Sequence, residues 1–317
     1  MFDTMDVETS KQGSPSSGMC SDGRVKINEV WHVRHGQKCI EVKGAERLAW
    51  KQSPRCKKAY FDTFITRHGH VQASRAGLYL KGLPFNQQPA GFDIVYTSPL
   101  VRAVQTAVCV SQSLGNLPLQ VVPGLCSCTA ALERIGPTAQ DNLMTDEEIR
   151  GTFPWATVLP RDPLAPTTFS ESEAWLAAKA SKKKCTEDNG DRSAYISRVL
   201  AVGHQEGTRM MAGGMVPTPH CCIGIFRTEA SEKTYKYELH DLLSNNGTSI
   251  NPSGESSPYA RPMMITMGQE DSPQNFGGDL DKSSDEEGGG DSAENAIAEH
   301  VIARTVSAVE GAPLPVV

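Results

Sequence analysis

The chain has 317 residues, a hydrophobic fraction of 38% and a formal net charge of −6. Ten acidic residues and a single lysine fall between Glu270 and Glu299, so the rest of the chain is mildly basic at +3 and does not repel an anionic substrate. No apolar run approaches the roughly 20 residues of a membrane span, and the first thirty residues lack a secretory signal and a myristoylation site. These features exclude a membrane partner and predict a cytoplasmic protein.

The nine cysteines are an odd number and are scattered along the chain. Neither Cys126-x-Cys128 nor the adjacent Cys221 and Cys222 has the C-x₂-C spacing of a zinc site. Free thiols in a reducing compartment are therefore predicted, and no metal or other cofactor is expected.

Residues 1–24 are rich in Ser, Gly and Asp and predict a disordered leader. Apolar, β-prone runs predict strands at 29–33, 92–97, 119–122, 199–202, 221–226 and 235–239. Apolar residues at helical spacing predict a helix from Thr66 onward and others near 100–114, 145–150 and 171–180. A further short helix is predicted after His204, running through Met211. Residues 38–60 have no clear period and predict a long loop.

Strands that alternate with helices indicate an α/β fold in which a three-layer, mostly parallel sheet is flanked by helices. We expect a single domain over residues 25–244. Residues 245–317 are acidic and rich in Ser and Gly, which predicts a disordered tail whose removal would leave stability almost unchanged. A weak apolar stripe at 292–309 is equally consistent with a docking helix and with chance.

Cationic or potentially cationic side chains follow three of the predicted strands. Arg34 and His35 end the first strand, Arg102 lies just past Ser98-Pro99, and His204 follows the strand at 199–202. Adjacent strand ends of an open α/β sheet converge on one crevice. Two arginines with forked donors and two histidines there would form a pocket for a dianionic phosphoryl group.

Four segments of the chain resemble, in order, the motifs of the histidine phosphatase (phosphoglycerate mutase-like) superfamily. They are Val33-Arg34-His35-Gly36-Gln37, Ile65-Thr66-x-x-Gly69-x-x-Gln72-Ala73, Ser98-Pro99-Leu100-x-Arg102-Ala103-x-Gln105-Thr106-Ala107 and Val202-Gly203-His204. One motif alone would be weak, whereas four in order make chance unlikely. The resemblance implies a single phosphoglycerate mutase-like domain.

The resemblance also implies a phosphomonoester hydrolase that works through a phosphohistidine on His35. Arg34, Arg102 and His204 would hold the phosphoryl oxygens, and an acidic residue would protonate the leaving alcohol and then activate water. No metal is needed. The implied partner is a phosphorylated small molecule or a phosphoprotein, not a nucleic acid, and a homodimer is a further prediction.

A second Arg-His-Gly occurs at Arg67-His68-Gly69. If His68 were the nucleophile, the Ile65-Thr66 helix motif of the family would have no counterpart in the chain. Residues 29–60 would then correspond to no part of the family pattern. We therefore assign the nucleophile to His35 and interpret His68 as a surface residue of a helix.

The proton donor departs from the family pattern. Ser127 stands where the glutamate of a Val-x-Pro-x-Leu-x-Glu segment would fall, and an unactivated serine is no acid near pH 7. Glu133, in Leu132-Glu133-Arg134-Ile135-Gly136, resembles the Leu-x-Glu-x-x-Gly variant of that segment. We assign the donor to Glu133, with a donor elsewhere in the chain as the alternative.

The layout of Trp50 and Phe61-Asp62 between the first two motifs is most similar to the branch of ubiquitin-associated and SH3-domain tyrosine phosphatases. Lys38-Cys39-Ile40-Glu41 stands where the mutases carry Ser-x-x-Asn, which favours a phosphatase over a mutase-like phosphotransferase. A catalytically weak or inactive phosphate-binding scaffold is the third hypothesis. The expected pocket walls, residues 38–60 and 133–166, carry no recognisable code for a substrate.

Overall fold

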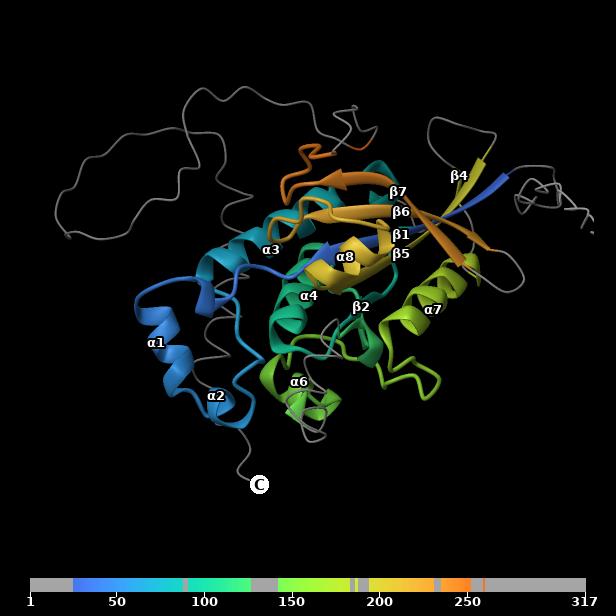
Figure 1. Cartoon of the computed structure of the whole chain (residues 1–317). Helices are drawn as coiled ribbons and strands as arrows, with labels where there is room; N and C mark the ends of the chain where they lie inside the picture. The colour runs from blue at the N-terminus through green and yellow to red at the C-terminus, as the bar shows by residue number, and fades with distance from the viewer. Residues whose placement is uncertain are drawn as a thin grey trace, which may run out of the picture.

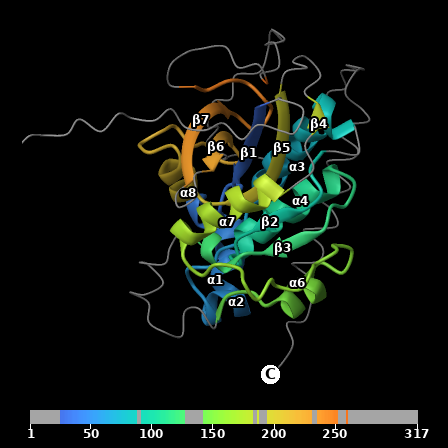
Figure 2. The same ribbon diagram turned by 90° about the vertical axis from the view of Figure 1, so that its right-hand side faces the viewer.

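The computed structural model describes residues 25–87, 91–126, 142–182, 186–187, 194–230, 235–251 and 259. Within these ranges the chain forms one sheet covered on both faces by helices (Figures 1 and 2). The predicted leader, the segment around Glu133 and nearly all of the predicted tail lie outside the described residues.

The strands are β1 (Val25–Arg34), β2 (Val95–Thr97), β3 (Leu119–Val121), β4 (Thr186–Glu187), β5 (Ala194–Gly203), β6 (Ile223–Ala230) and β7 (Tyr235–Leu243). Their order is β3-β2-β5-β1-β6-β7, with β4 paired to β5. The pairs β1–β5, β2–β5 and β2–β3 are parallel, whereas β6, β7 and β4 pair antiparallel. The predicted α/β class is confirmed, and the sheet as a whole is mixed.

The helices are α1 (Ala45–Gln52), α2 (Pro54–Lys58), α3 (Arg67–Lys81), α4 (Val101–Ser113), α6 (Asp146–Thr152), α7 (Phe169–Lys182) and α8 (Gln205–Met211). Short 3₁₀ turns cover Cys39–Glu41 (η1), Pro84–Gln87 (η2) and Pro123–Leu125 (η3). The predicted long loop at 38–60 is thus wrong, because η1, α1 and α2 lie within it. Two helices of eight and five residues are too short to show a clear period.

The two faces of the sheet follow from the alternation of side chains along β1 and β5. Trp31 and Val33 pack into one cluster with residues of α3 and α4, whereas Val30 packs into a second cluster with residues of α7. Successive residues of a strand point to opposite faces, so strands covered on both sides are apolar throughout. Figures 1 and 2 show the resulting three layers, with α1 and α2 beyond the carboxyl end of β1.

Residues beyond the predicted boundary at 244 also pack on the sheet. The amide of Ile250 donates to the carbonyl of Leu242 at 2.8 Å. The Tyr259 ring lies edge-on to Trp31, with ring centroids 5.2 Å apart, and its hydroxyl donates to the fully buried Glu29 at 3.0 Å. The folded unit therefore includes residues that sequence composition assigned to the tail.

Removing the chain from Asn245 onward is now expected to destabilise the protein, contrary to the expectation from composition. The deletion uncovers Trp31 and removes a partner of the buried Glu29 carboxylate. Loss of a fully buried aromatic side chain costs on the order of 3–5 kcal/mol, and we expect about half of that for the partly buried Tyr259, which lowers Tm by about 5 °C in a domain of this size. Thermal unfolding measures this, with deletion from Arg261 onward as the control. Equal Tm values for the two deletions would show that Tyr259 adds nothing.

Within the described part of the chain, no helix combines the length and the apolarity needed to cross a bilayer.

Candidate active site

The register of three neighbouring strands brings the predicted site residues to one edge of the sheet. Arg34 pairs with Gly203 across β1 and β5, and Thr97 pairs with Val202 across β2 and β5. His35, Ser98 and His204 directly follow these strand ends. The imidazole Nε2 of His204 lies 2.9 Å from Ser98 Oγ, and the rings of His35 and His204 are 5.3 Å apart between centroids.

His35 has the tautomer and the charge state of a nucleophile. It is 4% exposed, and its Nδ1 lies 2.8 Å from the carbonyl oxygen of Gly36. A carbonyl only accepts, so Nδ1 carries the proton and Nε2 keeps its lone pair. Burial, and then the nearby Arg102 guanidinium, hold the pKa of His35 well below its ordinary value. The imidazole is therefore neutral near pH 7.

Three buried nitrogens around His35 have no hydrogen-bond partner among the described residues: Arg34 Nε, Arg102 Nε and His204 Nδ1. Other atoms of the same arginines are held by backbone carbonyls, since Arg34 donates to Thr218 and Arg102 donates to Phe61 at 3.3 Å. Leaving a buried donor unpaired costs about 1–3 kcal/mol. An oxyanion is the kind of acceptor that donors of this type bind.

His204 can present an N–H at this position through its Nδ1. Ser98 Oγ accepts from the amide of Leu100 at 3.3 Å, so its own proton can be donated to His204 Nε2. The remaining nitrogen, Nδ1, then carries the hydrogen of the neutral ring. Burial, followed by Arg102 and His35, keeps the pKa of His204 well below its ordinary value. In this arrangement Ser98 holds Nε2 of the second histidine and leaves Nδ1 to donate.

Side chains from α3 and α4 hold the loop that carries His35. The amide of Gly36 donates to Thr106 Oγ1 at 3.0 Å, and the amide of Gln37 donates to Gln72 Oε1 at 3.1 Å. Thr66 Oγ1 donates to Gln37 Oε1 at 3.0 Å. The polar residues in the second and third sequence motifs therefore fix the backbone that follows β1.

The second Arg-His-Gly has a packing role through its glycine. A Cβ on Gly36 would lie 2.6 Å from the carbonyl oxygen of Gly69, and a Cβ on Gly69 would lie 2.7 Å from that of Gln37. Two backbones pass here at a distance that only glycine permits. His68, the middle residue of the repeat, is exposed on α3, as predicted.

Sequence reasoning gave no role to His220 or Glu41, which lie beside Arg34. His220 Nε2 is 2.9 Å from Glu41 Oε2 and 3.3 Å from Arg34 Nη2, and its ring centroid is 6.0 Å from that of His35. Partial burial would raise the pKa of Glu41, but hydrogen bonds from His220 and Lys38 outweigh it and hold that pKa below its ordinary value.

The position of His220 just before a strand is the sequence feature that could have indicated a place in the site. Because β6 runs antiparallel to β1, it starts at the edge where β1 ends. Recognising this required the strand direction, which no local pattern carries.

Glu133, the assigned proton donor, lies outside the described residues, as does Ser127. Among described carboxylates, Asp146 is engaged at both oxygens by the backbone and side chain of Arg161, at 3.0 and 2.8 Å. Glu206 is exposed in the first turn of α8, close enough to raise the pKa of Arg34 against the larger lowering by burial. No group of three or more His, Cys, Asp or Glu that could hold a metal occurs among the described residues.

The sequence profile of the histidine phosphatase superfamily, branch 1, matches residues 30–216. The chain therefore belongs to this superfamily, whose members include phosphatases and mutases. No curated protein sequence matches the chain.

Several solved structures are similar to the chain at low identity. The ecdysone phosphate phosphatase of Bombix mori, solved with tungstate, is 16% identical, with a TM-score of 0.41 over 77% of this chain and 97% of that one. A mycobacterial glucosyl-3-phosphoglycerate phosphatase is 16% identical, with a TM-score of 0.36 over 67% and 97%. The phosphoglycerate mutase of Plasmodium falciparum is 14% identical, with a TM-score of 0.32 over 67% and 89%. Likenesses this distant do not indicate a substrate.

Buried neutral histidines predict acid sensitivity of the fold. Burial lowers the pKa of His32 and of His70 from 6.5 to about 4. Between these pH values the unfolded chain binds protons that the folded chain does not, so the free energy of unfolding falls as pH falls from 6.5 towards 4. Two such groups give a slope of up to about 2.7 kcal/mol per pH unit, and the lowered pKa values of His35 and His204 add to it.

Urea unfolding at pH 7, 6 and 5 measures this slope above the range where most carboxylates titrate. His68→Gln, at the exposed position, is expected to keep the slope, whereas His70→Gln is expected to reduce it. An unfolding free energy that stays constant from pH 7 to pH 5 would contradict the assignment.

Proposed function

We propose that this protein is a phosphomonoester hydrolase that acts through a phosphohistidine on His35. The observation that carries the proposal is the set of three buried, unpartnered nitrogens, from Arg34, Arg102 and His204, around an imidazole whose Nε2 keeps its lone pair. This set matches the oxygens of a phosphoryl group in number and in charge.

In the proposed reaction, Arg34 and Arg102 neutralise the phosphoryl oxygens and His204 donates from Nδ1. The lone pair of His35 Nε2 forms a bond to phosphorus while the bond to the alcohol oxygen breaks in line. Glu133 is proposed to give a proton to that oxygen. The same carboxylate then takes a proton from the water that attacks phosphorus, which releases phosphate and restores neutral His35.

Hydrolysis is favoured over a mutase-like phosphotransfer by the segment that follows the nucleophile. Glu41 binds Lys38 Nζ at 3.0 Å and lies 2.9 Å from His220 Nε2, so the nearby lysine is already paired with a carboxylate. A mutase must hold its phosphorylated product until a phosphoryl group has been passed back to it. Unpaired cations next to the nucleophile would favour such retention. Within the superfamily, Trp50 and Phe61-Asp62 support the ubiquitin-associated and SH3-domain branch.

The proposed substrate is a phosphorylated small molecule or a phosphoprotein. The free thiols of Cys39, Cys56, Cys221 and Cys222 support a reducing compartment such as the cytoplasm. A homodimer stays a prediction.

Hydrolysis of p-nitrophenyl phosphate with and without EDTA tests the proposal. We expect turnover that EDTA does not abolish, and a ³²P-labelled enzyme that survives an alkaline quench but loses its label in acid, as a phosphoramidate does. Binding of inorganic phosphate without turnover would instead support the scaffold hypothesis. Activity that requires an added metal would overturn the proposal.

A further inference from the structure

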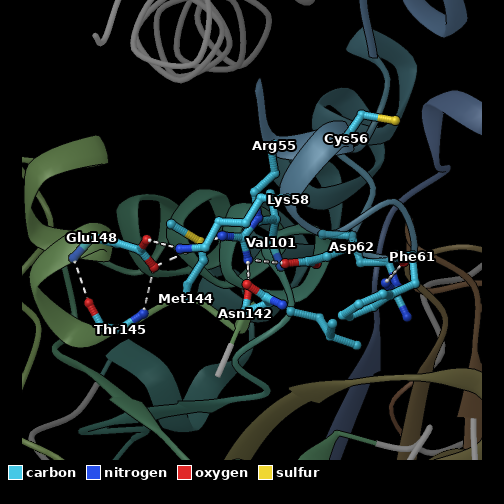
Figure 3. Close-up of polar contacts among 12 residues, drawn as sticks. Arg55, Cys56, Lys58, Phe61, Asp62, Val101, Asn142, Met144, Thr145 and Glu148 are labelled. Atoms are coloured by element: carbon cyan, nitrogen blue, oxygen red, sulfur yellow. Dashed lines mark hydrogen bonds and ion pairs between the residues drawn. The ribbon is translucent and has the colours of Figure 1, made fainter. Parts of the chain in front are cut away.

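We propose that Asp62 is a positioning residue that holds the phosphate-binding Arg102 through the first turn of α4 and is kept from neutralising it by Arg55. The inference rests on the proposed function, because it concerns how one of the phosphate ligands is placed. Asp62 is fully buried, and Figure 3 shows it between Arg55 and Val101.

Asp62 supplies the cap that α4 lacks in its own sequence. The N-cap residue, Leu100, has no side chain able to accept a hydrogen bond, and the next amide, that of Val101, donates to Asp62 Oδ1 at 2.7 Å. A carboxylate at a helix N-terminus pairs an orphan amide and is favoured by the helix dipole. Arg102 is the residue directly after Val101, so this bond fixes the backbone from which its side chain extends.

The residue before Asp62 contacts the guanidinium itself. Arg102 Nη1 donates to the carbonyl oxygen of Phe61 at 3.3 Å, while Arg102 Nε has no partner among the described residues. Residue 61 therefore holds one guanidinium nitrogen of Arg102, and residue 62 holds the backbone amide of the preceding residue, Val101. The rest of the fork is left for the phosphoryl group.

Arg55 keeps Asp62 from competing with phosphate for Arg102. Arg55 Nη2 donates to Asp62 Oδ2 at 2.5 Å, so one carboxylate oxygen is engaged by Arg55 and the other by Val101. Burial raises the pKa of Asp62, and the charges of Arg55 and then Arg102 oppose that rise. A carboxylate bound directly to Arg102 would have to be displaced by the substrate. A carboxylate whose hydrogen bonds are made by Arg55 does not have to be displaced.

Arg55 also connects the two predicted pocket walls, residues 38–60 and 133–166, to the helix that carries Arg102. Arg55 lies on α2, and its Nη2 also donates to the carbonyl oxygen of Asn142 at 2.7 Å. Its Nη1 is 4.0 Å from Glu148, which also binds Lys58 at 3.2 Å (Figure 3). These contacts therefore connect both walls to the start of α4.

The test replaces Asp62 by asparagine, which retains an acceptor for Val101 but presents an amide to Arg55. We expect kcat/KM for p-nitrophenyl phosphate to fall about 10–100-fold, since displacements near 1 Å have effects of this size. The dissociation constant of inorganic phosphate, measured by calorimetry, is expected to rise in parallel. Asp146→Asn is the matched control, because Asp146 is also a buried carboxylate at a helix start paired to an arginine, Arg161. It is expected to lower Tm while leaving both catalytic readouts within about twofold of wild type.

A double-mutant cycle separates positioning from general destabilisation. If Asp62 acts through Arg102, then Asp62→Asn has no further effect on kcat/KM in an Arg102→Ala background. Effects that multiply would overturn the proposal, as would wild-type kinetics and phosphate affinity for Asp62→Asn.

Arg55→Lys tests the same point if Asp62→Asn does not fold, since it keeps the charge but loses the fork that reaches Asp62 and Asn142 together. A several-fold loss of kcat/KM that disappears in the Arg102→Ala background is expected, and an unchanged kcat/KM would overturn the proposal. A wild-type protein that binds phosphate without turnover would refute the hydrolase alone, because the phosphate affinities still test Asp62. A wild type that does not bind phosphate would refute both.

Discussion

Replacing His35 by alanine is expected to lower kcat for p-nitrophenyl phosphate at least about 10³-fold, because the variant has no atom on which the phosphoenzyme can form. The neutral imidazole, with Nδ1 donating to Gly36, is the nucleophile in the proposed reaction. Arg34, Arg102 and His204 are unchanged in the variant. We therefore expect it to bind inorganic phosphate still, which separates loss of chemistry from loss of the pocket.

His68→Ala is the matched control, since His68 occupies the same place in a second Arg-His-Gly but is exposed on α3. It is expected to retain wild-type kcat and Tm. An inactive His68→Ala together with an active His35→Ala would show that the nucleophile has been assigned to the wrong repeat.

Replacing Glu133 by glutamine is expected to affect poor leaving groups far more than good ones. A nitrophenolate leaves without a proton, whereas an alkoxide needs one in the transition state, and general acid catalysis is worth about 10²–10⁴-fold there. Glu133→Gln should therefore keep much of its phosphoenzyme formation with p-nitrophenyl phosphate and lose most activity on alkyl phosphates. Dephosphorylation should also slow, because the same carboxylate activates water, and a burst of nitrophenol is then expected in stopped-flow traces.

Glu206→Gln is the comparison, because Glu206 is a described carboxylate whose charge reaches Arg34. It is expected to change activity on aryl and alkyl phosphates by the same small factor. If Glu206→Gln shows the leaving-group dependence and Glu133→Gln does not, the proton donor is Glu206. Equal losses on both substrate classes for Glu133→Gln would mean that Glu133 shapes the pocket without transferring a proton.

Local sequence was enough to predict the fold class and the edge of the sheet where the candidate site lies. Val30 to Val33 form an apolar run that stops at Arg34-His35-Gly36, and a run of this kind is typical of a strand that delivers side chains to the rim of an α/β sheet. The helices from Thr66 and after Pro99 were predicted for the same reason, since apolar spacing and turn residues are local properties. Strand and helix patterns together with the four motifs therefore predicted the family that the sequence profile confirms.

Tertiary structure alone decided which residues support that edge. Asp62 caps a helix that starts 39 positions later, and Glu29 accepts a hydrogen bond from the hydroxyl of Tyr259, which is 230 positions away. His220 reaches Arg34 only because β6 runs antiparallel to β1 and starts where β1 ends. Each of these contacts depends on strand order, direction and register, which arise from packing both faces of one sheet and leave no periodic trace around the residues concerned. The sequence by itself thus determined the strand ends and the chemistry they carry, whereas the fold decided which distant side chains hold them in place.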